Sequence, residues 1–104
     1  MSKIEKFEDI EAWRLARELC NKIVHIVKST ELEKDYSLRD QISRSSGSVM
    51  DNIAEGFERG GNKEFIRFHS IAKGSCGETR SQLYRCYDKK NIDEKHLVNL
   101  KMTV

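Results

Sequence analysis

The chain has 104 residues, with 19 Lys and Arg and 17 Asp and Glu, which leaves a formal net charge of +2. This length allows one domain, and we expect residues 1–104 to form it. The absence of proline, with many Glu, Lys, Arg and Leu residues, argues against a turn-rich all-β domain and favours helices. So small a net charge argues against a monomer that binds polyanions strongly.

Hydropathy and the cysteines exclude two further classes. No run approaches the roughly 18 apolar residues of a membrane-spanning helix, and the charged N-terminus lacks the apolar core of a signal peptide. The three cysteines are widely spaced, match no zinc motif and are typical of reduced thiols. We therefore expect a cytoplasmic protein with no membrane partner and no metal site.

Apolar residues recur at steps of three and four in three long segments, which is the spacing of an amphipathic helix. The first segment runs from about residue 7 to 29, and a polar loop is expected at 30–35. Ser37 is a plausible N-cap for the second helix. Within that helix, Ser43–Ser48 has the composition of a linker, and its Ser45–Gly47 stretch consists of small residues. Because the apolar phase continues on both sides, we expect one unbroken helix there.

The glycine pair Gly60–Gly61 is the clearest break in the helical pattern, because glycine adopts the backbone geometry that ends helices. Asn62 is expected to cap the third helix, which is predicted to extend to about Lys90. Asp93 is a plausible N-cap for a shorter last helix. The expected core face of the third helix comprises Phe65, Phe68, Ala72, Cys76 or Ser75, Thr79, Leu83 and Tyr87.

Four helices joined by short loops predict an all-α fold. The simplest packing is an antiparallel up-down-up-down four-helix bundle with a short fourth helix. That helix cannot cover the full length of the third, so part of the third helix's apolar face is expected to stay exposed in a monomer. Because a contiguous exposed apolar patch usually marks an interface, we expect a homo-oligomer.

Three strings of residues resemble a known family. They are Phe7–Trp13 (FEDIEAW), Ser48–Arg59 with its NIAEGF string, and Glu64–Glu78 with EFIRF followed by IAKGS. Together they resemble the bacterial four-helix-bundle proteins of 23S rRNA intervening sequences, sometimes labelled ribosomal proteins. The resemblance implies a bundle that assembles as a ring-like homopentamer. It also implies a relation to accessory proteins of diversity-generating retroelements, which bind nucleic acid through basic surfaces.

A polar stripe accompanies the apolar face of the second helix, and polar residues of the third helix can face it. We interpret part of it as a structural network, because a buried polar group without a partner costs about 1–3 kcal/mol. The alternative is a ligand or nucleic-acid site. The expected network residues are Ser48, Asn52, Glu55 and Glu78.

Basic residues around the glycine pair, with one more on the polar stripe of the second helix, are the candidates for contact with nucleic-acid phosphates. These candidates are Arg44, Arg59, Lys63 and Arg67. Glu58 and Glu64 are close enough to neutralise much of this charge, so a solvated face without a ligand is the alternative. In an oligomer the patch is repeated, and weak sites act together.

No catalytic or cofactor motif stands out. The three histidines lie on different predicted helices, and there is neither a phosphate-binding loop nor a dinucleotide fingerprint. We therefore expect no enzyme activity, no catalytic residue, no cofactor and no small-molecule substrate. The leading hypothesis is a non-catalytic oligomer that associates with RNA or DNA through basic surfaces. The alternative is a structural protein–protein assembly module with no nucleic-acid ligand.

Overall fold

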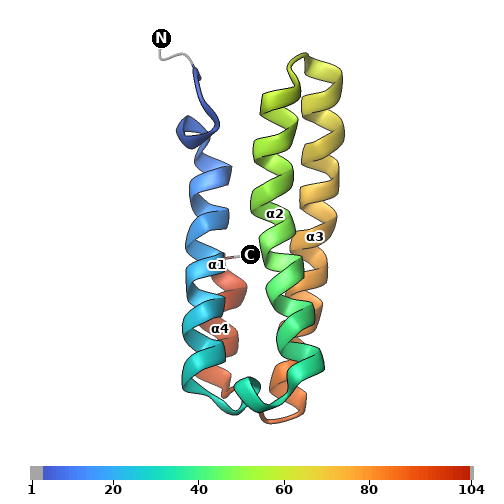
Figure 1. Cartoon of the computed structure of the whole chain (residues 1–104). Helices are drawn as coiled ribbons and strands as arrows, with labels where there is room; N and C mark the ends of the chain where they lie inside the picture. The colour runs from blue at the N-terminus through green and yellow to red at the C-terminus, as the bar shows by residue number, and fades with distance from the viewer. Residues whose placement is uncertain (1–3, 104) are drawn as a thin grey trace.

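The computed structural model describes residues 4–103, and four α-helices account for most of them. The helices are α1 (Glu11–Ser29), α2 (Tyr36–Arg59), α3 (Asn62–Asp88) and α4 (Glu94–Thr103). Two short 3-10 helices, η1 (Phe7–Asp9) and η2 (Glu31–Lys34), precede α1 and connect it to α2. Figure 1 shows successive helices running antiparallel, with α4 beside the lower half of α1. The described residues contain no strand, so the predicted all-α four-helix bundle with a short fourth helix is confirmed.

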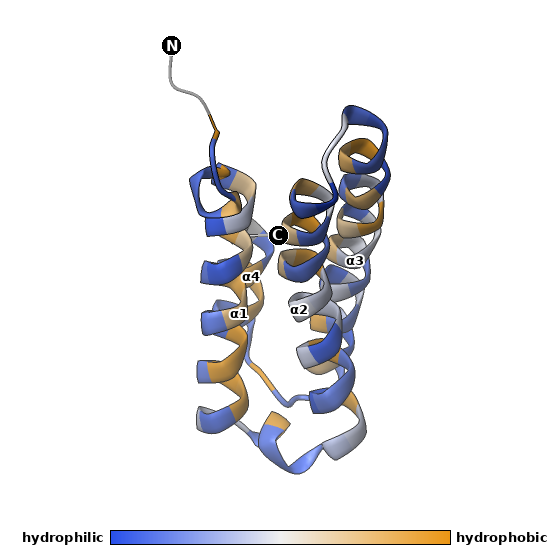
Figure 2. Cartoon of the chain, turned by 45° about the horizontal axis from the view of Figure 1, so that its top comes forward, coloured by the Kyte–Doolittle hydropathy of each residue, from blue (hydrophilic) through white to orange (hydrophobic). Residues whose placement is uncertain are grey.

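The hydrophobic core consists of two clusters stacked along the bundle. The lower cluster takes buried residues from all four helices, including Ile23 of α1, Ile42 of α2, Leu83 of α3 and Leu100 of α4. The upper cluster surrounds Trp13 and takes its buried residues from α1, α2, α3 and the residue before α1, with none from α4. The hydropathy colouring of Figure 2 shows apolar residues on the inner sides of the helices.

The short fourth helix leaves an apolar groove above its end. The groove has a volume of about 330 Å³. Its walls come from α1 and α3 and its floor from α2: Ala12, Leu15, Ala16, Leu19, Val49, Ile53, His69, Ala72, Lys73 and Cys76. Leu15 is 48% exposed although it belongs to the apolar side of α1. The uncovered apolar surface that the sequence predicts is therefore present, and it lies over three helices rather than on α3 alone.

Two of the three predicted helix caps are wrong. The second helix is capped by Asp35, whose carboxylate accepts a hydrogen bond from the Leu38 amide at 3.4 Å, and Ser37 already lies inside α2. The N-cap of α3 is Gly61, which offers no side chain, so Asn62 is the first helical residue instead of the cap. The Asp93 cap is confirmed, since its carboxylate accepts from the His96 amide at 2.8 Å.

The unbroken second helix is confirmed, because α2 continues through Ser45–Gly47. Ser45 and Ser46 are 4% and 2% exposed, so their small side chains let α2 approach its neighbours closely. The predicted core face of α3 is wrong at its end, where Tyr87 is 37% exposed and Cys86 is fully buried. Along residues 4–103, none of the helices is both long enough and apolar enough to cross a membrane.

Candidate nucleic-acid interface

The turn between α2 and α3 brings three of the four predicted phosphate-binding residues to one end of the bundle. Gly60 and Gly61 have φ angles of +74° and +80°, a region in which most side chains are strained. These two residues reverse the chain, so the last turn of α2 lies beside the first turn of α3 (Figure 1). Gly56 permits the close approach, since a β-carbon there would lie 2.8 Å from the β-carbon of Phe68.

Arg59 and Arg67 converge on a single aromatic ring. Their Cζ atoms lie 4.9 Å and 5.0 Å from the centroid of the Phe68 ring, within cation–π range. Phe68 is buried, whereas the two arginine side chains are 51% and 61% exposed. Both guanidinium groups therefore contact the same buried ring while remaining open to solvent.

Both arginines also pair with carboxylates of their own helices. Arg59 donates from Nε and Nη2 to Glu55 Oε2 at 3.0 Å and 2.8 Å, and Arg67 Nη1 donates to Glu64 Oε2 at 3.3 Å. Exposed ion pairs of this kind contribute only about 0–1 kcal/mol, so a phosphate can displace the carboxylate at small cost. The carboxylates nevertheless balance the local positive charge, as the sequence suggests.

Lys63 lies in the first turn of α3, beside backbone amides that no side chain caps. Because the N-cap residue is Gly61, no side-chain oxygen accepts from the first amides of the helix. These amides and the positive end of the helix dipole favour an anion. Arg44 is not brought to this place, because it lies about 22 Å before Arg59 along α2 at 1.5 Å per residue. The candidate phosphate-binding cluster is therefore Arg59, Lys63 and Arg67.

The predicted polar network exists in part between α2 and α3. Ser48 Oγ and Ser75 Oγ lie 3.0 Å apart, and Asn52 Nδ2 donates to Ser48 Oγ at 2.9 Å. The other two predicted members lie elsewhere: Glu55 pairs with Arg59 on the surface, and Glu78 is exposed. Ser48 and Asn52 thus fasten α2 to α3 without the two glutamates.

Sequence reasoning missed the most buried part of this network. Ser45 Oγ donates to Gln82 Oε1 at 2.6 Å and accepts from Thr79 Oγ1 at 2.8 Å. All three residues are at least 94% buried. The sequence did contain an indication of this network, because Ser45 and Thr79 lie at helical spacing from the apolar residues of their own helices. A satisfied network of this kind specifies how two helices pack.

Basic residues of α1 form a second positive surface that the sequence analysis did not single out. Arg14, Arg17 and Lys28 are all exposed and lie on one side of the helix. The Arg17 guanidinium is 5.9 Å from the Trp13 ring. The signal that could have found this surface is the helical spacing of these three cations.

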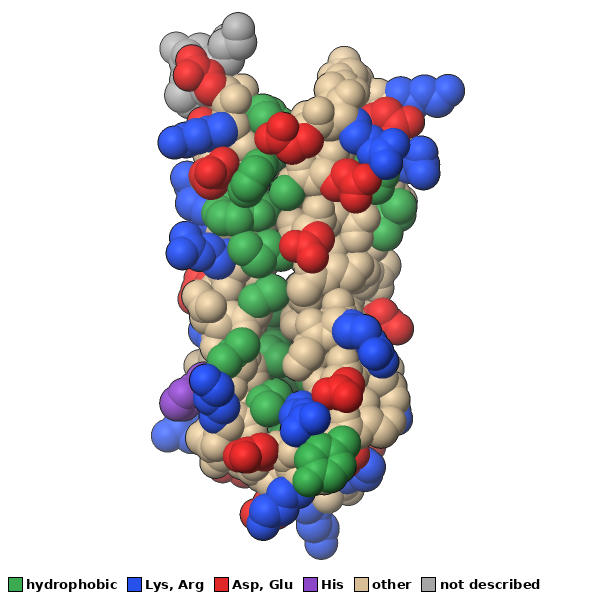
Figure 3. Space-filling model, in the orientation of Figure 1, with side chains coloured by type: hydrophobic (Ala, Val, Ile, Leu, Met, Phe, Trp, Pro, Cys, Tyr) green, Lys and Arg blue, Asp and Glu red, His purple; other side chains and the backbone are tan. Residues whose placement is uncertain are grey.

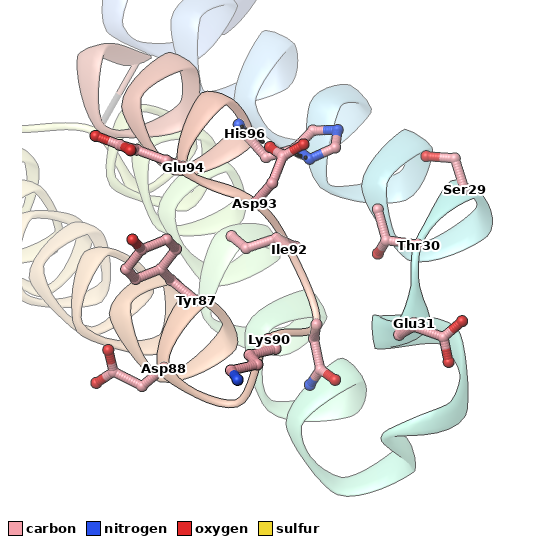
Figure 4. Close-up of a pocket in the computed structure, with 11 residues that line it drawn as sticks. Ser29, Thr30, Glu31, Tyr87, Asp88, Lys90, Ile92, Asp93, Glu94 and His96 are labelled. Carbon is pink, nitrogen blue, oxygen red and sulfur yellow. Dashed lines mark hydrogen bonds and ion pairs between the residues drawn. The ribbon is translucent and has the colours of Figure 1, made fainter.

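A surface depression of about 790 Å³ lies at the opposite end of the bundle from the α2–α3 turn. Figure 4 shows carboxylates of Glu31, Asp88, Asp93 and Glu94 around it. Such a lining repels phosphate. His96 closes one side, with its Nδ1 atom 2.9 Å from Asp93 Oδ1. The hydrogen bond from the His96 amide is the main reason that the pKa of Asp93 lies below its usual value.

The cysteines and histidines provide no evident reactive centre. Within residues 4–103, no group of three or more His, Cys, Asp or Glu side chains is placed to hold a metal ion. Burial raises the pKa of Cys86 to about 11, so this residue is a thiol at neutral pH. Burial likewise raises the pKa of Cys20 and of Cys76. None of the three has the lowered pKa of a nucleophilic cysteine.

Comparison with known proteins identifies the family. Residues 8–104 match the family model described as 23S rRNA-intervening sequence protein. A search of curated proteins finds no match. The matched region contains all four helices and the α2–α3 turn, as the motif resemblance predicts. The chain therefore belongs to the family of 23S rRNA-intervening sequence proteins.

Proposed function

We propose that this protein is a non-catalytic, self-associating bundle that binds RNA phosphates at the α2–α3 turn. One observation carries the proposal: Arg59 and Arg67 share the Phe68 ring beside the uncapped start of α3, where Lys63 lies. Two planar guanidinium groups and free backbone amides form hydrogen-bonding geometry suited to phosphate oxygens. The family description refers to an intervening sequence of 23S rRNA, which makes RNA the first ligand to test.

Self-association is part of the proposal because a single cluster is weak. Three carboxylates, Glu55, Glu58 and Glu64, lie close to it in the chain, and the whole chain carries only +2. Several copies joined together present several clusters to one RNA, which raises the overall affinity without new contacts. The open apolar groove at Leu15 supports assembly, since exposed apolar surface favours burial.

A salt-titrated RNA-binding assay tests the proposal. Fluorescence anisotropy would compare a labelled 23S rRNA fragment with a random RNA of the same length, for the wild type and for Lys63→Glu/Arg67→Glu. We expect binding that weakens as salt rises, and a loss of about tenfold or more in the double variant. Affinity independent of salt would contradict binding through phosphates.

The matched control makes the same change of charge at the other end of the bundle. In Lys34→Glu/Lys95→Glu both residues are exposed and far from the turn. We expect this variant to retain most of the affinity. If both double variants lose affinity equally, the effect comes from net charge and the assignment to the α2–α3 turn is wrong.

The second candidate function is a protein–protein assembly module without a nucleic-acid ligand. The observation that favours it is the pairing of Arg59 and Arg67 with their own carboxylates, which satisfies both arginines within the chain. This candidate predicts oligomers of normal size and no salt-sensitive RNA binding at any protein concentration. Mass measurement and the anisotropy assay on the same sample distinguish the two functions.

A further inference from the structure

The exposed side of α1 carries a row of three basic residues. The basic stripe consists of Arg14, Arg17 and Lys28, with the neutral residues Asn21 and Val24 between them. The nearby acid Glu18 pairs instead with Lys22 and lines the depression that α1 forms with α4. Among the described residues no ion pair is formed by any of the three cations of the stripe. Three charges are thus available to a partner.

The adjacent helix α2 carries a surface of the opposite sign. The acidic stripe consists of Asp40, Asp51, Glu55 and Glu58, with Arg44 and Gly47 between them. Asp40 and Glu55 pair with arginines of their own helix, and Asp51 and Glu58 are exposed. A β-carbon at Gly47 would meet no atom within 4 Å. Glycine there costs about 1 kcal/mol of helix stability, and nothing within the chain offsets that cost.

Partly exposed apolar side chains lie along the seam between α1 and α2. Phe7, Met50, Ala54 and Phe57 pack against the upper core around Trp13 without being fully buried. Figure 3 shows hydrophobic atoms along this seam, with acidic side chains on the α2 side and basic side chains along the α1 edge. This face therefore joins an apolar centre to two flanks of opposite charge.

The charges of the two stripes match in height along the bundle. The Cys20 thiol donates to the Ser46 carbonyl at 3.3 Å, which sets these residues level on the antiparallel helices. Because the two helices are antiparallel, each step toward the N-terminus of α1 from Cys20 corresponds to a step toward the C-terminus of α2 from Ser46. Arg17 is therefore level with residue 49, two residues from Asp51. Lys28 is level with Leu38, two residues from Asp40. Each interval of two residues is about 3 Å along the axis.

The one cation of the acidic stripe, Arg44, lies at the height where the basic stripe has only neutral residues. Arg44 is level with Lys22, which pairs with Glu18 and lines the depression between α1 and α4, and it is close in height to the neutral Asn21 and Val24 of the basic stripe. Val24 is 51% exposed and offers apolar surface at that height. The single cation of the acidic stripe thus coincides with the gap in the basic stripe. If the helices of a partner copy lay at the same height, its acidic residues would lie opposite the cations at both ends of the basic stripe. Its Arg44 would lie opposite the neutral residues in the middle of that stripe.

We propose that this face joins copies of the chain, with the basic stripe of one copy lying against the acidic stripe of the next. The proposal rests on the self-association included in the proposed function and names its surface. A symmetry axis parallel to the bundle preserves heights, so Arg17 of one copy meets Asp51 of another and Lys28 meets Asp40. Gly47 lets the two helices approach closely.

A second copy fits this face better than a nucleic acid does. An RNA backbone would gain attraction at the basic stripe and repulsion at the acidic stripe beside it. The partner must therefore carry both signs side by side, in the same order along its length. The α1–α2 face of this chain has that pattern.

The test is a mixing experiment with two charge-reversal variants, followed by sedimentation equilibrium. We expect Arg17→Glu and Asp51→Lys each to weaken self-association by about tenfold or more, because like charges then face each other. In an equimolar mixture, the new carboxylate of the first variant faces the new ammonium group of the second, and the unchanged Arg17 and Asp51 face each other at the reciprocal contact. We therefore expect the mixture to recover most of the wild-type association. Changed monomer stability alone cannot produce this recovery.

The control variant reverses a charge on a helix that carries neither stripe. Arg80→Glu changes the charge of an exposed residue of α3, away from both stripes and outside the apolar groove, and is expected to leave the association unchanged. An oligomer that survives both reversals, or a mixture that fails to recover, overturns this surface while leaving self-association intact. A wild type that is monomeric at about 100 μM, where even weak associations of this class are populated, overturns both.

Discussion

Ser45 of α2 and Gln82 of α3 share a 2.6 Å hydrogen bond inside the bundle. Ser45→Ala removes the donor and leaves the buried Gln82 carbonyl oxygen without it, so we expect a loss of about 1–3 kcal/mol in the free energy of unfolding. Urea denaturation followed by circular dichroism measures it. Ser43→Ala makes the same chemical change at an exposed position of α2 and is expected to stay within about 0.5 kcal/mol of the wild type. Equal effects of the two substitutions would contradict a role for burial.

Glycines at two sites are predicted to respond oppositely to alanine. Gly56→Ala places a β-carbon 2.8 Å from the Phe68 β-carbon, and neither group can move without shifting a helix. We expect a loss of about 1–3 kcal/mol in unfolding free energy, typical of overpacking. Gly74→Ala meets no atom within 4 Å and is expected to gain about 0.5–1 kcal/mol from helix propensity. Thermal unfolding of both variants measures the sign, and a stabilised Gly56→Ala would show that the helices are not in close contact.

Asp35 ties the start of α2 to the end of α3, and its removal is predicted to reduce the acid sensitivity of the fold. Its carboxylate pairs with Lys89 Nζ at 2.5 Å and accepts from Asn91 Nδ2 at 2.9 Å. These hydrogen bonds hold the pKa of Asp35 below its ordinary value of 3.8. A lowered folded-state pKa contributes stability that is complete above the unfolded value and disappears as pH falls through the folded value.

The measurement is the urea midpoint between pH 7 and pH 2. We expect the wild type to lose more stability than Asp35→Asn below about pH 4, because the asparagine does not titrate. Asp88→Asn, at an exposed position nearby, is the control and is expected to follow the wild type. Parallel curves for all three proteins would exclude Asp35 as a source of acid sensitivity.

Cys86 is predicted to be the most protected of the three thiols. It is fully buried, and burial raises its pKa to about 11, so both access and thiolate formation are suppressed. In the native protein at pH 8 we expect an aromatic disulfide reagent to modify Cys86 far more slowly than the half-buried Cys20 and Cys76. Peptide mass mapping over time gives the order. Rapid modification of Cys86 in folded protein would mean that the lower core opens readily, and in urea all three should react alike.

Regular patterns in the sequence were sufficient to predict the helices. The apolar phase ran through Ser45–Gly47 and indicated an unbroken α2, because a helix repeats its buried face every 3.6 residues whatever the small residues between. The pair Gly60–Gly61 likewise marked the turn, since few other residues adopt its positive φ angles. The caps were less predictable, because Asp35, Ser37 and Asn62 all have capping side chains and the backbone decides which is used.

The candidate site was predictable only in part. Arg59, Lys63 and Arg67 lie close in the chain and stayed together, whereas Arg44 is separated from them by the length of α2. Nothing in the one-dimensional pattern showed that Arg59 and Arg67 share the Phe68 ring, since that depends on the angle at which α2 and α3 pack. The same packing placed Gln82 opposite Ser45 and excluded Glu78 from the buried network.

The sequence by itself determined that this protein is a helical bundle, where its helices turn and which family it resembles, because these properties depend on local periodicity and short motifs. The tertiary structure decided which charged side chains become neighbours. A helix presents several residues to every direction, so only the packing of α1 beside α2 aligns Arg17 with the level of Asp51. The small net charge of +2 therefore conceals two stripes of opposite sign, which the composition averages to nearly nothing.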